Sequence, residues 1–261
     1  MGTLAIIISL ALLMFFAYRG ISVLILAPIM AAVAILLSGD MAYMMPQYTE
    51  TFMSALGGYI LKFFPIFLLG ALFGQLMVDS GAASSISNSI MNKLGHQRAI
   101  LTVVLACGVL TYGGVSLFVV AFAIYPIAKS MFQAANIPKR LIPGAIALGS
   151  FTFTMTALPG SPSIQNAIPI PFFGTNVFAA PGIGIISGLI MFSLGSIWLQ
   201  SRANKARSNG EGYGVDTEEG EKLEDGVTSK GEMPVFLAFL PLLLVIGVNA
   251  LFTYIIFPGM D

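Results

Sequence analysis

FTFTMTALPGSPSIQN, residues 151–166, lies between apolar segments and joins three alternating threonines to Pro159-Gly160-Ser161-Pro162. Two prolines and a glycine within four residues cannot continue an α-helix, because proline lacks an N–H group and its ring clashes with the preceding turn. In lipid, each unpaired backbone group costs several kcal/mol, so such a break survives only inside protein or along a wet cavity. The stretch therefore predicts either an extramembrane loop or a transmembrane helix that is broken at a solute site.

The composition is typical of an integral membrane protein. Of the 261 residues, 57% are hydrophobic and 9% are charged, whereas soluble domains contain about 25% charged residues. The formal net charge is zero, so no nucleic-acid partner is indicated. One cysteine and one histidine exclude the CxxC and HExxH metal motifs, and the GxxxxGK[ST] and GxSxG motifs do not occur. We therefore expect an all-α membrane protein that is not an enzyme and has no metal site and no cofactor.

Apolar runs divide the chain into segments that are long enough to lie in a membrane. The expected crossing segments are 4–18, 21–38, 55–78, 182–200 and 234–257. The first two are separated only by Arg19-Gly20 and predict a tight hairpin, and 55–78 can cross with some tilt. Two polar stretches, 79–98 and 201–233, are expected to be a cytoplasmic linker and a cytoplasmic loop.

Residues 99–128 contain two apolar arms, AILTVVLACGVL and LFVVAFAIYPIA, on either side of the sequence TYGGVS at 111–116. Each arm spans roughly 18 Å as a helix, whereas the hydrocarbon core of a bilayer is about 30 Å thick. Neither arm crosses alone. The segment is therefore either one interrupted crossing or a re-entrant hairpin with its tip at 111–116.

The distribution of basic residues favours the re-entrant hairpin. With the N-terminus outside and 99–128 re-entrant, every Lys and Arg falls in the cytoplasm except Lys62, which lies within a crossing segment. With 99–128 as a full crossing, only Arg19, Lys93 and Arg98 remain inside. The hairpin also requires residues 139–171 to cross as one broken helix. The expected location is the cytoplasmic (inner) membrane, with the chain crossing it several times.

The hairpin tip and the helix break form the candidate site, since both consist of small polar residues and glycines. Neither motif contains Asp, Glu, Lys, Arg or His, so an anion would be held by backbone N–H groups at helix N-termini and by hydroxyls and amides. The same residues could instead only repair the ends of broken helices. The candidate substrate-binding residues are Thr111, Tyr112, Gly113, Gly114, Ser116, Thr154, Thr156, Gly160, Ser161, Ser163, Gln165 and Asn166.

The order of GALFGQLMVDSG, LTYGGVSLFVVAFAIYPIA, ANIPKRL and ALPGSPSIQNAIP resembles the gluconate permease family of proton symporters, within the ion-transporter superfamily of inverted-repeat carriers. The resemblance covers nearly all of residues 4–200. It implies a scaffold part at 1–78 that forms a homodimer and a transport part at 99–200 that carries a small hydroxy- or carboxylic acid inward. On this resemblance the chain is half of an inverted-repeat secondary transporter, and 234–257 begins the second half.

Two departures from the family pattern bear on the function. A second hairpin and broken helix do not follow Phe257, so a fragment is expected rather than a working half-transporter. The sequence SPSIQN at 161–166 lacks a histidine that some gluconate carriers have near this point, which makes a smaller acid such as hydroxybutyrate an alternative to gluconate. Sodium is an alternative to the coupling proton. A membrane scaffold without transport, or an enzyme with an intramembrane cavity, is the alternative class of function.

The expected topology can be tested by cysteine labelling. Cysteines introduced at Lys93 and at Lys139, in a Cys107→Ser background, should both react with a membrane-impermeant maleimide only from the cytoplasmic side. The reason is that a re-entrant hairpin returns the chain to the side from which it entered. Labelling is compared in intact cells and in inverted vesicles, and reaction of the two positions from opposite sides would contradict the hairpin.

Overall fold

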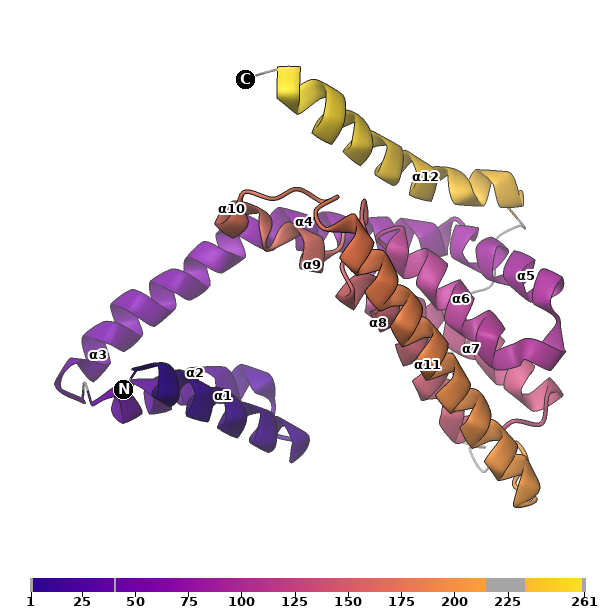
Figure 1. The fold of residues 1–261 in the computed structure, drawn as a ribbon, viewed down its shortest axis with the longest axis horizontal. Helices are drawn as coiled ribbons and strands as arrows, with labels where there is room; N and C mark the ends of the chain where they lie inside the picture. Colours follow the sequence, from indigo (N-terminus) through magenta and orange to yellow (C-terminus); the bar gives the residue numbers. More distant parts are fainter. Residues whose placement is uncertain (1, 40, 215–232, 260–261) are drawn as a thin grey trace. The chain divides into compact units, whose positions relative to one another are not determined.

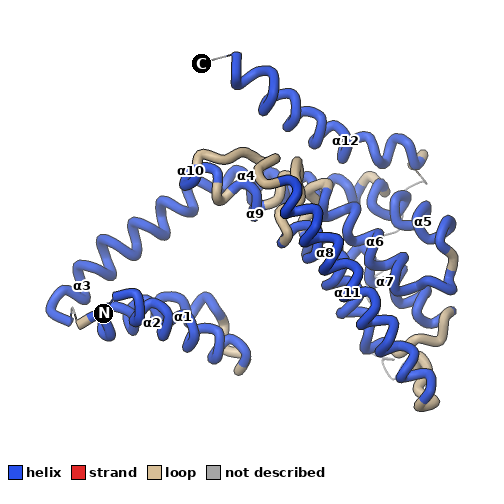
Figure 2. Tube along the Cα trace, in the orientation of Figure 1, coloured by secondary structure: helices blue, strands red, loops and turns tan. Residues whose placement is uncertain are grey.

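The computed structural model describes residues 2–39, 41–214 and 233–259, which form helices with short connections (Figures 1 and 2). The chain divides into two units, Met1–Pro65 and Ile66–Asp261. The described residues contain no β-strand, which agrees with the all-α class expected from the sequence. Within the described part, three helical segments are long and apolar enough to span a membrane. They are Met44–Asp79, Pro181–Ser208 and Val235–Ile256.

The first unit begins with two apolar helices, α1 (Gly2–Tyr18) and α2 (Val23–Ser38), which pack against each other. Three short helical elements follow: η1 (Met41–Tyr43), α3 (Met44–Pro46) and η2 (Gln47–Phe52). They lead into α4 (Met53–Asp79), which runs from the first unit into the second.

The second unit is a bundle with α6 at its centre. Its elements are, in order, α5 (Ala82–Leu94), η3 (His96–Arg98), α6 (Ala99–Tyr112), α7 (Leu117–Ala134), η4 (Lys139–Leu141), α8 (Ile142–Met155), α9 (Ile164–Ala167), α10 (Ile170–Phe173), α11 (Pro181–Ser208), α12 (Val235–Leu251), η5 (Phe252–Ile256) and η6 (Phe257–Gly259). Helix α6 contacts α5, α7, α8 and α11, and ten of its fourteen residues are buried (Figure 1). Helices α6 and α7 form a helical hairpin, and its re-entrant course stays a prediction.

Glycines bring α6 and α8 close together. A Cβ atom on Gly149 of α8 would collide with the Val104 carbonyl oxygen and lie 2.7 Å from the Cβ of Cys107 on α6. A Cβ on Gly108 of α6 would lie 2.5 Å from the ring of Phe153 on α8. The backbones of the two helices therefore lie close to each other with no large side chain between them, as small residues allow in membrane bundles. Since α8 precedes the predicted break and α6 carries the predicted tip, this contact joins the two motifs.

The polar stretches are more helical than the sequence analysis expected. The linker 79–98 contains α5, which buries Ala82, Ala83, Ile86 and Ser87. Helix α7 continues past the apolar arm to Ala134, and α11 continues to Ser208. A helix ends where its hydrogen-bonding pattern stops rather than where its hydrophobicity falls, so polar turns extend an apolar helix. Of the expected loop 201–233, residues 215–232 lie outside the described residues.

A short segment after α11 is fixed to the connection between α7 and α8. The guanidinium of Arg140 donates two hydrogen bonds to the carboxylate of Glu211, at 2.6 and 2.7 Å. Beside this pair, the Tyr213 N–H group donates to the Asn136 side-chain oxygen at 2.9 Å, and the Tyr213 side chain is buried. The segment that follows α11 is therefore held to the connection that leads into α8.

The Glu211→Gln variant should be slightly less stable than wild type at neutral pH. The hydrogen bond from Arg140, followed by its charge, lowers the pKa of Glu211 below its ordinary value. Because the folded-state pKa is depressed, the stabilisation is complete above the ordinary pKa of a glutamate and is lost as the pH falls through the lowered value. Both side chains are exposed, so the effect is small. The difference in melting temperature between wild type and Glu211→Gln, measured in detergent, should become smaller as the pH is lowered from about 7 to about 3. A difference that does not change with pH would contradict the stabilising contact between Arg140 and Glu211.

The Gly149→Ala variant should be destabilised, because the added methyl group meets backbone atoms of α6 that cannot move alone. Overpacking of this kind costs about 1–3 kcal/mol. Gly247→Ala in α12 is the matched control, since nothing lies within 4 Å of its added Cβ. Thermal unfolding in detergent measures both variants. A stability of Gly149→Ala equal to that of Gly247→Ala would show that α6 and α8 do not pack in this way.

Candidate functional site

A cavity of about 250 Å³ lies where the tip of the α6–α7 hairpin meets the break after α8. The third wall is the part of α4 that begins the second unit. Its polar lining consists of Thr111, Ser116, Thr154, Ser163 and Gln165, and its apolar and glycine lining consists of Ile66, Phe67, Gly70, Ala71, Gly114, Val115, Leu117, Phe151, Met155, Pro162 and Ile164. None of the described residues that line the cavity is charged. The two motifs that the sequence analysis singled out thus share one small cavity.

The hairpin tip turns on Gly114. Its φ angle of +100° is one that glycine adopts without steric cost, and its N–H donates to the Thr111 carbonyl at 3.0 Å. A Cβ on Gly114 would lie 2.7 Å from the ring of Pro162, so the tip touches the break directly. Ser116 precedes the first turn of α7 and makes no capping hydrogen bond. Ser116 and Leu117, the first residue of α7, both line the cavity.

The break separates α8 from the one-turn helix α9 (Figure 2). The chain leaves α8 through Ala157, whose φ of 50° is uncommon for a residue with a side chain, and through Gly160, whose φ is +81°. It re-enters helical structure at Ile164. Ser163 precedes this turn, and its hydroxyl oxygen is buried without a hydrogen-bond partner. A buried hydroxyl without a partner is uncommon.

Two hydrogen bonds of opposite direction join the tip to the break. The Tyr112 hydroxyl donates to the Pro159 carbonyl at 2.8 Å, and the Ser161 hydroxyl donates to the Tyr112 carbonyl at 3.0 Å. The Asn166 side-chain amide donates to the carbonyls of Leu158 and Ser161, at 2.8 and 2.9 Å. These bonds fix the path of the irregular chain around the cavity.

The twelve candidate residues of the sequence analysis fall into two groups. The cavity is lined by Thr111, Gly114, Ser116, Thr154, Ser163 and Gln165, and the lining does not include Tyr112, Gly113, Thr156, Gly160, Ser161 and Asn166. In the second group the side chains of Tyr112, Ser161 and Asn166 donate to backbone carbonyls, as does the Thr156 hydroxyl. An added Cβ on Gly160 would lie 2.7 Å from the ring of Phe178. The four polar side chains of the second group thus bond to the backbone around the cavity.

Sequence reasoning missed the α4 wall. Gly70 and Ala71 line the cavity, and a Cβ on Gly74 would lie 3.3 Å from the backbone nitrogen of Ser116. The spacing Gly70-x-x-x-Gly74 was the available signal, because small residues one turn apart allow another chain to approach a helix closely. The motif could not show which segment makes that approach.

The cavity offers donors to an anion without offering a charge. The hydroxyls of Thr111 and Thr154 already donate to the carbonyls of Cys107 and Ser150, at 2.8 and 2.9 Å. The hydroxyls of Ser116 and Ser163 make no such bond. Gln165 donates only to the sulfur of Met155, a weak acceptor, at 3.2 Å. Two hydroxyls and one amide are therefore the donors most easily redirected to a solute.

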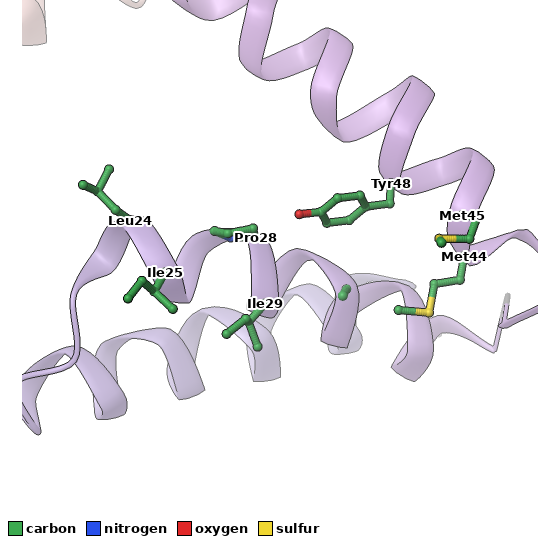
Figure 3. Close-up of a pocket in the computed structure, with 8 residues that line it drawn as sticks. Leu24, Ile25, Pro28, Ile29, Met44, Met45 and Tyr48 are labelled. Atoms are coloured by element: carbon green, nitrogen blue, oxygen red, sulfur yellow. The ribbon is translucent and has the colours of Figure 1, made fainter.

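A larger groove of about 600 Å³ lies in the first unit between α2 and the segment 44–48. Its lining is Leu24, Ile25, Pro28, Ile29, Ala32, Met44, Met45 and Tyr48, so the Tyr48 hydroxyl is the one polar side-chain group among them. Figure 3 shows the Tyr48 ring extending toward Pro28 across the groove. A groove of this chemistry suits hydrocarbon, such as lipid, and lacks the donors that a carboxylate needs.

Comparisons with known proteins find two similar transporters. The chain is 50% identical over 258 residues to an uncharacterized transporter of Bacillus subtilis, YxjC, with 97% of this chain and 54% of the relative covered. It is 35% identical over 127 residues to an uncharacterized transporter of Haemophilus influenzae, with 48% of this chain and 30% of the relative covered. No solved structure matches the chain.

The chain spans about half the length of the Bacillus relative. The model of the GntP family permeases matches residues 1–257, which confirms the family expected from the sequence. By the extent of this match, the chain belongs to the GntP family of permeases.

Proposed function

We propose that this chain forms a substrate-binding part of a secondary transporter that takes up a small hydroxy- or carboxylic acid, such as hydroxybutyrate or gluconate. The observation that carries the proposal is the uncharged cavity of about 250 Å³ at the meeting point of the hairpin tip and the helix break. The family and the transporter relatives support the class of protein. The solute and its coupling to a proton are part of the proposal.

The carboxylate of the solute would bind at the α7 and α9 side of the cavity. Ser116 precedes α7, whose N-terminal N–H groups favour negative charge. The Ser163 hydroxyl, which has no partner, would donate to one carboxylate oxygen, and Gln165 would exchange its weak bond to sulfur for a bond to oxygen. The threonine hydroxyls of Thr111 and Thr154 retain lone pairs that could accept a bond from a hydroxyl of the solute.

Coupling and topology belong to the same proposal. The protein would lie in the cytoplasmic membrane with its N-terminus outside and Thr111 to Ser116 at the tip of a re-entrant hairpin. The lining holds no group that titrates near neutral pH, so a coupling proton would bind elsewhere. Sodium is the alternative coupling ion, and it would need only neutral oxygen ligands. Residues 1–78 would serve as the dimerising scaffold, against which the part at 99–200 moves.

The Ser163→Ala variant should bind and transport the solute more weakly. Loss of one hydrogen bond from a neutral donor to a carboxylate costs about 1.5–3 kcal/mol, or roughly 10- to 150-fold in affinity. Ser116→Ala should act in the same direction. Thr152→Val is the matched control, because the Thr152 hydroxyl is buried without a partner and the residue does not line the cavity.

The measurement is gradient-driven uptake of radiolabelled 3-hydroxybutyrate and gluconate into proteoliposomes. The natural protein at its full length is used, with equal amounts of each variant inserted. The KM for the transported acid should rise in Ser163→Ala and Ser116→Ala and stay unchanged in Thr152→Val. Unchanged KM values in both serine variants would show that the cavity is not the solute site, and uptake of neither acid by wild type would contradict the proposed substrates.

A further inference from the structure

We infer that Asn166 is a positioning residue. Its side chain holds the backbone of the helix break in place, so that Ser163 and Gln165 line the cavity. The inference rests on the proposed function, because it concerns the side chains that would bind the solute. Asn166 lies in α9, between these residues and the end of the one-turn helix. A helix of one turn has too few hydrogen bonds to be stable by itself, so its position must be fixed by other contacts.

Three backbone carbonyls converge on the Asn166 side chain. Its Nδ2 atom lies 2.8 Å from the Leu158 oxygen, 2.9 Å from the Ser161 oxygen and 3.4 Å from the Val177 oxygen. Carbonyl oxygens only accept hydrogen bonds, so this convergence also settles which end of the amide faces them. The side chain thereby joins both sides of the break to the loop that precedes α11.

The carbonyls need this donor because the break is short of N–H groups. Pro159 and Pro162 have none, and the Gly160 N–H already donates to Val177 at 2.9 Å. The Ser161 N–H reaches the Leu158 oxygen only at 3.4 Å. Asn166 is 7% exposed and Ser161 is fully buried, so water does not easily replace the missing donors. The Asn166 amide therefore supplies short hydrogen bonds to the Leu158 and Ser161 carbonyls, for which the break has few N–H donors.

The same residue sets the position of the two proposed ligands. The Asn166 backbone N–H donates to the Ser163 carbonyl at 3.0 Å, which closes the turn containing Ser163 and Gln165. The side chain fixes that turn to residues 158 and 161, so a shift of Asn166 moves both cavity-lining groups. Asn166 itself does not line the cavity. Direct binding of a solute would also require its amide to release two short hydrogen bonds.

The Asn166→Asp variant tests the inference, since it keeps the size of the side chain and replaces the donor with an acceptor. At about pH 7.5 the introduced carboxylate repels the three carbonyls, and the KM for uptake should rise at least about tenfold relative to wild type. Toward about pH 5 the buried carboxyl group should bind a proton and donate to one carbonyl, so the ratio to wild type should shrink. Among the residues that hydrogen-bond around the break, Tyr112 is the one other titratable side chain, and its phenol keeps its proton between about pH 5 and about pH 7.5.

Asn176→Asp is the matched control. It makes the same chemical change ten residues away, where the Asn176 side-chain oxygen accepts from the Phe178 N–H at 2.9 Å, a role that a carboxylate retains. Its KM should equal that of wild type at both pH values. Uptake is measured with the full-length protein and radiolabelled 3-hydroxybutyrate or gluconate, whichever acid wild type transports.

Hydrogen–deuterium exchange of residues 158–168 provides a readout that does not depend on transport. Exchange should be severalfold faster in Asn166→Asp than in wild type or in Asn176→Asp. A raised KM with unchanged exchange would identify Asn166 as a direct ligand and overturn the positioning role, as would an unchanged KM. If wild type takes up neither acid, the proposed function fails, and the exchange rates alone decide whether Asn166 holds the break.

Discussion

The backbone carbonyls at the break after α8 need hydrogen-bond donors, and the rest of this structure depends on that need. Pro159 and Pro162 stop the helix and remove two donors, yet Gly160 and Ser161 between them are buried. The amide of Asn166 and the hydroxyl of Tyr112 supply the missing hydrogen bonds from other segments. Without these partners each orphaned group would cost several kcal/mol in lipid. Once they are satisfied, the break can persist and its irregular backbone can border a cavity.

Close packing of α6 against α8 joins the break to the α6–α7 hairpin. Gly108 and Gly149 let the two helices approach at backbone distance, so the hairpin that begins with α6 and the break that follows α8 are held together. By contrast, the long helices expose large apolar side chains, such as Ile183 at 72% and Phe236 at 74%. In a membrane protein such surfaces contact lipid or other helices. The buried core of the second unit therefore lies mainly on α5 to α8, and the ends of α6, α7 and α8 border the cavity.

The proposed binding of an anion in a cavity whose described lining is uncharged has a consequence for its release. A fixed cation would bind a carboxylate strongly and slow its release, whereas hydroxyls and helix N-termini bind it with several weaker contacts. The described lining fits the second case, because Ser116, Ser163 and Gln165 each carry a donor group. Water would take the place of the proposed solute on these donors when it leaves. The residues that fix the backbone are separate from these donors. Such a division lets the donors exchange partners while the cavity keeps its shape.

The sequence by itself determined the all-α membrane class, the family and the two places where helices stop, because composition and the sterics of proline and glycine act within a few residues. It also selected the two motifs that share the cavity. Only the tertiary structure decided that Ser163 lines the cavity while Ser161 and Asn166 hold the chain, and that α4 supplies the third wall. These roles depend on partners far apart in sequence, such as Tyr112 and Pro159. A side chain's neighbours are set by how whole helices pack, and a local pattern of residue types carries no record of that packing.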